Sequence, residues 1–125
     1  MDDREIRAAL ERRYANITDQ EEVHELYADD VIFELPQGKE RIVGLANLRA
    51  MREAYPAQVE ITPTRIRGSG PLWVIEVLIS YDGGAPMHAV NIMEFRQGKI
   101  VHEAIYFGDP WQAPAWRAQW VEPMA

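Results

Sequence analysis

The sequence predicts one domain of the α+β class, in which helices cover a curved, mainly antiparallel sheet. Apolar residues recur every three or four positions up to Tyr55, which is the helical period, and every second position from Ala57 onward, which is the strand period. Glycine-containing turns divide the second part into strands of hairpin spacing. A chain of 125 residues, 47% of them hydrophobic, supplies one core rather than two.

Two helices are expected at the start of the chain. The first covers residues 3–17, with acids in its first turn, where the helix dipole favours them. Its apolar stripe has helical spacing and consists of Ile6, Ala9, Leu10, Arg13, Tyr14 and Ile17. The second helix begins at Thr18 or Asp19, either of which can cap it, and ends at Asp29 and Asp30.

A strand, a third helix and four further strands complete the expected order. Val31–Leu35 is the strand, and the turn Pro36-Gln37-Gly38 ends it. The third helix begins at Gly44 and ends before Pro56, because the residue before a proline disfavours helical backbone. The remaining strands are expected at residues 59–67, 72–81, 87–96 and 99–107. Helices gathered on one face of such a sheet leave a cavity between the two layers.

Composition excludes several classes of function. The formal net charge of −7 argues against nucleic acid, since phosphate binding requires clustered Lys and Arg. No apolar run is long enough to cross a membrane, and there is no cysteine for disulfide or thiolate chemistry. The three histidines lack metal-ligand spacing. We therefore expect a cytoplasmic protein without metal or cofactor.

Four segments of the sequence carry a recognisable pattern: Tyr27-Ala28-Asp29-Asp30-Val31, Pro36-Gln37-Gly38, Val43-Gly44-Leu45 and the hairpin of residues 94–101. These segments resemble proteins of the NTF2-like superfamily, and most closely its SnoaL-like branch, which includes polyketide cyclases. The resemblance extends over roughly residues 6–107. It implies a cone-shaped fold with three N-terminal helices, a small-molecule pocket and a homodimer through the outer sheet face.

The ketosteroid isomerases of this superfamily provide a residue-by-residue comparison. Tyr14 matches their oxyanion-hole tyrosine, and Asn91 matches their oxyanion-hole acid. Leu35 stands where their catalytic base stands, and a leucine cannot accept a proton. This departure argues against isomerisation of that type. No Asp-Arg-Asp arrangement of the epoxide hydrolases is found.

Alternation along the strands predicts which side chains point into the cavity. Tyr14, Asn91 and Glu103 are its expected polar groups and our candidates for catalysis, with Tyr14 and Asn91 as hydrogen-bond donors and Glu103 as acid and base. Each also has a structural interpretation: a core tyrosine, an inter-strand amide, and a salt bridge to a residue such as Arg52. The expected apolar ligand-binding residues are Phe33, Leu35, Met51, Ile75, Val77, Met93, Ile105 and Phe107. His88 could reach the rim, whereas His24 is placed on a polar helix face.

Three functions remain open. The first is a cofactor-independent enzyme acting on a hydrophobic, carbonyl-bearing molecule, and the second is a binding protein with the same pocket. The third is an interaction module that uses the outer sheet face and the tail of residues 108–125. That tail contains Trp111, Trp116 and Trp120, so we expect it to pack on the body or on a second subunit.

Overall fold

The computed structural model describes residues 1–124 as three α-helices, six strands and two short 3₁₀ helices. The helices are α1 (Asp3–Ala15), α2 (Gln20–Glu25) and α3 (Leu45–Glu53). The strands are β1 (Tyr27–Leu35), β2 (Glu40–Val43), β3 (Val59–Ser69), β4 (Leu72–Tyr81), β5 (Met87–Arg96) and β6 (Lys99–Gly108). The 3₁₀ helices are η1 (Pro36–Gly38) and η2 (Ala115–Trp120). The predicted α+β class is confirmed.

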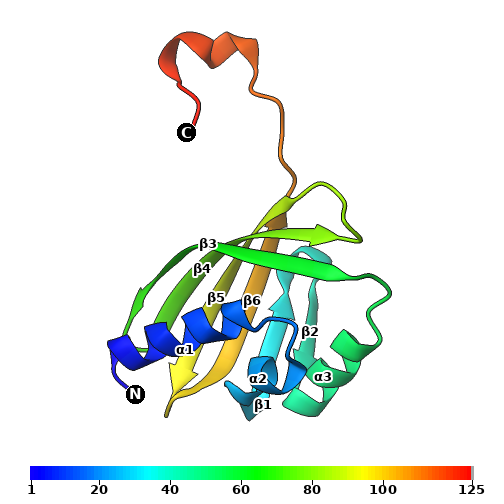
Figure 1. The fold of residues 1–125 in the computed structure, drawn as a ribbon, viewed down its shortest axis with the longest axis vertical. Helices are drawn as coiled ribbons and strands as arrows, with labels where there is room; N and C mark the ends of the chain where they lie inside the picture. The colour runs from blue at the N-terminus through cyan, green and yellow to red at the C-terminus, as the bar shows by residue number, and fades with distance from the viewer. Residues whose placement is uncertain (125) are drawn as a thin grey trace.

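All six strands form one sheet in the order β2-β1-β6-β5-β4-β3. Neighbouring strands are antiparallel except β1 and β6, which run parallel. The sheet is strongly bent, and the three helices lie on one of its faces (Figure 1). None of the helices in residues 1–124 is long and apolar enough to span a bilayer.

The helix starts follow from their capping residues. Asp2 forms a capping box with Glu5 at the start of α1, and Asp19 accepts hydrogen bonds from the first backbone N–H groups of α2. The expected end of the second helix was wrong. Helix α2 stops at Glu25 and β1 starts at Tyr27, so Asp29 and Asp30 are exposed residues of a strand.

The core lies between α1 and the concave face of the sheet. On β4 every second residue from Trp73 to Ile79 is buried, and Leu10 of α1 is completely buried against this layer. Full burial of one such side chain stabilises the fold by about 2 kcal/mol. The alternation predicted from the sequence therefore identifies the inward face of the sheet.

The C-terminal tail extends away from the body after β6 (Figure 1). Trp111, Trp116 and Trp120 are 80%, 73% and 72% exposed. The tail was expected to pack on the body or on a second subunit, and these side chains do not pack on the body. The 3₁₀ helix η2 contains no buried residue. Packing of the tail on a second subunit stays a prediction.

Candidate functional site

A cavity of about 560 Å³ lies between the helices and the concave sheet face. Its walls come from α1, α2, α3 and all strands except β2. Eight of the predicted site residues line it: Tyr14, Phe33, Leu35, Met51, Val77, Asn91, Ile105 and Phe107. At its edge the rings of Tyr55 and Tyr81 lie 5.7 Å apart, and Tyr55 is 44% exposed. The volume is that of an ordinary small-molecule site.

Two predicted apolar ligand contacts, Ile75 and Met93, do not line the cavity. Both point to the predicted side of the sheet, but each is 0% exposed. They lie at the end of the sheet that α1 covers, where the Arg13 guanidinium is 3.9 Å from the Met93 sulfur. Strand alternation identifies the face on which a residue lies, whereas the position of the helix decides which part of that face stays open.

Glu103 is completely buried and does not line the cavity either. Its Oε1 accepts a hydrogen bond of 2.5 Å from the Tyr27 hydroxyl, and its Oε2 accepts one of 2.5 Å from the Asn91 side-chain amide. Two donors therefore occupy the carboxylate oxygens, and Asn91 stands at the cavity wall in front of it.

Two arginines converge on the hydroxyl group that holds Glu103. The Tyr27 oxygen accepts from Arg13 Nη2 at 2.8 Å and from Arg52 Nη2 at 3.1 Å. Their guanidinium carbons lie 5.2 and 5.3 Å from the centre of the Tyr27 ring, within cation–π range. With two bonds accepted and one donated, the Tyr27 hydroxyl is saturated. Because the two arginines can only donate, the hydroxyl proton of Tyr27 points toward Glu103.

His24 extends this network behind Arg52, and its tautomer follows from its partners. Its Nδ1 lies 2.7 Å from the Gln20 carbonyl oxygen, which can only accept, so Nδ1 carries the proton. Its Nε2 then accepts from Arg52 Nη1 at 3.2 Å. Burial lowers the pKa of His24, and the neighbouring Arg52 adds to this effect against the opposing bond to Gln20. The ring is therefore neutral, and its placement on a polar helix face was wrong because it is 2% exposed.

The same environment keeps both tyrosines protonated and Arg13 charged. Burial raises the pKa of Tyr14, and it raises the pKa of Tyr27 despite the two arginines beside that ring. Burial alone would lower the pKa of Arg13, but Tyr27, Tyr14 and Glu103 outweigh it and raise that pKa. The site therefore holds fixed cations and neutral hydroxyl donors.

Several polar atoms of the cavity-lining residues have no hydrogen-bond partner within residues 1–124. Within residues 1–124, Arg13 Nε is the one enclosed side-chain atom that lacks a hydrogen bond. The Tyr14 hydroxyl and Asn91 Oδ1 also lack a protein hydrogen bond but are not enclosed, and both side chains line the cavity. The carboxylate of Glu103 accepts only, so the amide nitrogen of Asn91 must face it. The carbonyl oxygen of Asn91 therefore points elsewhere and remains available.

Arg13, Tyr27 and Arg52 were not predicted as site residues. Arg13 and Arg52 occupy positions in the apolar stripes of α1 and α3, and a charged residue in such a position is the signal that could have identified them. Tyr27 gave no comparable signal because it was placed in a helix. His88 is exposed and lies outside this cavity.

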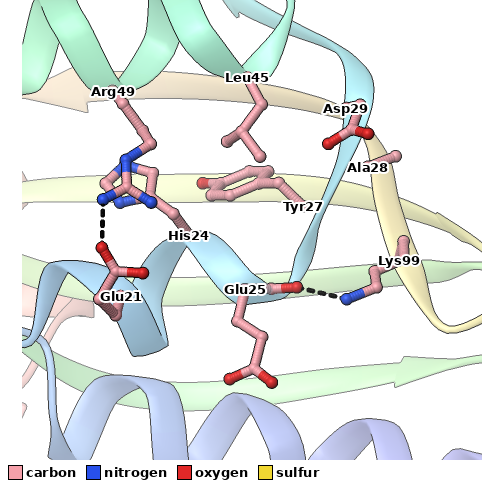
Figure 2. Close-up of a pocket in the computed structure, with 9 residues that line it drawn as sticks. All are labelled: Glu21, His24, Glu25, Tyr27, Ala28, Asp29, Leu45, Arg49 and Lys99. Carbon is pink, nitrogen blue, oxygen red and sulfur yellow. Dashed lines mark hydrogen bonds and ion pairs between the residues drawn. The ribbon is translucent and has the colours of Figure 1, made fainter.

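A second hollow, of about 520 Å³, is lined by residues that include His24 and Tyr27 (Figure 2). Its two cationic side chains are bound to the protein itself. Arg49 pairs with Glu21 at 2.5 Å, and Lys99 Nζ donates to the Glu25 carbonyl oxygen at 2.5 Å. The remaining charged groups of this hollow, Glu25 and Asp29, are exposed surface carboxylates, so the apolar cavity is the better candidate site.

Together the bent sheet, its helices and the cavity between them define a class: small α+β pocket domains. The chain belongs to the SnoaL-like domain family, whose model matches residues 5–103. Comparison with curated proteins gave no match.

Solved structures place the chain among NTF2-like proteins. An NTF-2 like protein of unknown function from Burkholderia xenovorans LB400 is 44% identical over 100% of this chain and 99% of its own, with a TM-score of 0.91. A proposed ketosteroid isomerase from Kribbella flavida DSM 17836 is 28% identical over 96% of this chain and 90% of its own, with a TM-score of 0.82. A LEH-like epoxide hydrolase of M. tuberculosis shares the fold at 21% identity, with 80% of each chain covered and a TM-score of 0.67.

Proposed function

We propose that the protein binds a small, largely apolar molecule in the cavity between α1, α3 and the sheet. The observation that carries this is the composition of the lining: aliphatic and aromatic side chains surround a few polar groups, and two of these, the Tyr14 hydroxyl and Asn91 Oδ1, have no protein partner. An apolar pocket with few convergent polar groups is the usual form of a small-molecule site. These two atoms are available to hydrogen-bond with a polar group of the ligand.

A cofactor-independent acid–base enzyme acting on a hydrophobic, carbonyl-bearing molecule is the second candidate. It is favoured by the buried carboxylate of Glu103, which lies 2.5 Å from a proton-bearing tyrosine oxygen. Two observations make the enzyme less well supported than the binding protein. Glu103 does not line the cavity, and Leu35 does line it at the position that corresponds to the base of the ketosteroid isomerases.

A neutral fluorescent probe tests the binding proposal. N-phenylnaphthylamine (NPN) becomes fluorescent in apolar sites, and we expect saturable binding to the protein. Ile61→Trp places a bulky ring in the cavity and should weaken NPN binding by about 10-fold or more. Thr62→Trp adds the same ring to the exposed face of the same strand and should leave binding unchanged. Equal affinities for the two variants would refute binding in this cavity.

We also propose a homodimer through the outer face of the sheet. Val90 and Ile92 of β5 are only partly covered there, and Tyr106 of β6 is 42% exposed. Covering such an apolar face would remove it from water. Light scattering at micromolar concentration should give twice the mass of one chain, and Ile92→Lys should shift it toward one. A single-chain mass for the unaltered protein would reject the dimer.

A further inference from the structure

The charges that line the cavity are opposite in sign to the charge of the protein. The chain carries 20 acidic and 13 basic residues, with a formal net charge of −7. Yet the charged residues of the cavity wall are Arg13 and Arg52, and no aspartate or glutamate of residues 1–124 lines it. The other polar lining groups, including Tyr14 and Asn91, are neutral. The cavity wall therefore carries positive charge, although the protein as a whole is acidic.

The protein supplies only part of the negative charge that these arginines require. Glu103 is the single buried carboxylate of residues 1–124, and it reaches the arginines only through the Tyr27 hydroxyl. Neither Arg13 nor Arg52 forms an ion pair with a carboxylate in that part of the chain. His24, the remaining titratable neighbour, is neutral. Two fixed cations against one anion leave an excess of one positive charge beside an apolar cavity.

The arginines also retain hydrogen-bond donors. A guanidinium carries five N–H groups. Arg52 uses its two terminal nitrogens on His24 and Tyr27, and its Nε has no hydrogen-bond partner among the described residues. Arg13 uses one terminal nitrogen on Tyr27 and the other on the weakly accepting Met93 sulfur, and its Nε has no partner. Unpaired charge in an apolar setting is costly, and an anion is the group that offsets it.

We propose that the ligand of this cavity is an amphiphilic monoanion, with an apolar body along the sheet and an acidic head, such as a carboxylate, at the arginine side. This inference rests on the proposed small-molecule function and specifies its substrate class. Arg52 is its principal contact, because its side chain lines the cavity and is only partly buried. Arginine suits such a head, since its planar donor array matches carboxylate geometry. Attraction to a partly buried guanidinium beside an apolar wall is stronger than to one on the open surface.

A matched pair of probes separates this inference from the proposed function. Anilinonaphthalene sulfonate (ANS) differs from NPN only by its sulfonate group. The overall charge of the protein repels ANS, and an uncharged apolar pocket would prefer NPN. We expect the unaltered protein to bind ANS at least as tightly as NPN, with both probes lost in Ile61→Trp.

Substitutions on one helix identify the charge responsible. Arg52→Met should weaken ANS binding by about 10-fold more than it weakens NPN binding. Arg49→Met removes the arginine that pairs with Glu21 outside this cavity and should change neither. Arg52→Lys keeps the charge and should retain most of the ANS affinity, which provides a variant that folds if the methionine does not.

The outcomes are distinct. If NPN binds but ANS binds more than about 10-fold more weakly, the anionic class is wrong and the proposed binding function stands. Equal losses of both probes in Arg52→Met and Arg52→Lys would likewise overturn it. If neither probe binds the unaltered protein, the proposed function fails and the inference fails with it.

Discussion

Two buried tyrosines of the same core should respond very differently to loss of one oxygen atom. Tyr27 and Tyr14 are 2% and 6% exposed. The Tyr27 hydroxyl takes part in three hydrogen bonds, each with a charged partner, whereas the Tyr14 hydroxyl has no hydrogen-bond partner in the part of the chain that the structure describes. Phenylalanine keeps the ring, so neither Tyr27→Phe nor Tyr14→Phe opens a large void. The comparison isolates the hydroxyl network.

The magnitude follows from the bonds that are lost. A hydrogen bond to a charged group contributes about 1.5–3 kcal/mol, and a buried partner left unsatisfied adds its desolvation cost. In Tyr27→Phe, the Glu103 carboxylate loses one of its two donors and both arginines lose an acceptor. Since the guanidinium groups can partly rebond, we expect a loss of about 3–5 kcal/mol in the free energy of unfolding. Tyr14→Phe should change it by less than about 0.5 kcal/mol.

Urea unfolding followed by circular dichroism measures both values. At about 1.5 kcal/mol per molar urea, the Tyr27→Phe midpoint should fall by roughly 2–3 M, and the Tyr14→Phe midpoint should stay nearly in place. If the two variants differ by less than about 1 kcal/mol, Tyr27 does not join the arginines to Glu103, and the order of donors derived for the site is wrong.

Two further predictions concern the same network. Glu103→Gln removes the buried negative charge and places a second amide opposite that of Asn91, so the free energy of unfolding should fall by about 3 kcal/mol. Glu94→Gln, at an exposed position, should leave the free energy of unfolding unchanged. Equal urea midpoints for the two variants would refute the role of Glu103. The lowered pKa of His24 means that the unfolded chain binds its proton first, so this residue should reduce stability as pH falls below about 6.5, by at most about 1.4 kcal/mol per pH unit. His24→Asn should show a shallower decline between about pH 6.5 and 5 in urea titrations, and an unchanged slope would contradict the neutral tautomer.

The sequence predicts the strands best where both their pattern and their turns are strong. The bounds of β4 and β5 were predicted as residues 72–81 and 87–96, and both are confirmed. Gln97 and Gly98, which follow β5, both have positive φ, as a two-residue hairpin turn requires. Apolar alternation on these strands is long enough to define the inward face.

Elements with mixed charge and little burial were missed. β2 has four residues, Glu40–Val43, and only Ile42 among them is partly buried, so no alternation marks it. It is formed because its backbone pairs with β1. The start of β1 was missed for a similar reason, since Asp29 and Asp30 look like the end of a helix and not like strand residues. In both cases pairing with a distant segment overrides local preference.

For the candidate site, too, one part could be predicted from the sequence and another could not. Alternation placed Asn91 and Glu103 on the inward side of their strands, where the structure has them. What it could not predict is which groups meet, because the partners come from far along the chain: Tyr27 reaches Glu103 across 76 positions, and Arg13 reaches Met93 across 80. A single sequence carries the period of each element but not the placement of one against another.

A residue that the ligand does not reach can therefore decide what the cavity offers. Asn91 could present either end of its amide to a ligand, and a strand pattern cannot distinguish the two. Glu103 decides, because a carboxylate accepts only and so turns the amide nitrogen toward itself. With glutamine at 103 that constraint disappears, and Asn91 can turn over. The acceptor at this wall of the cavity is therefore a property of the buried carboxylate as much as of the asparagine that displays it.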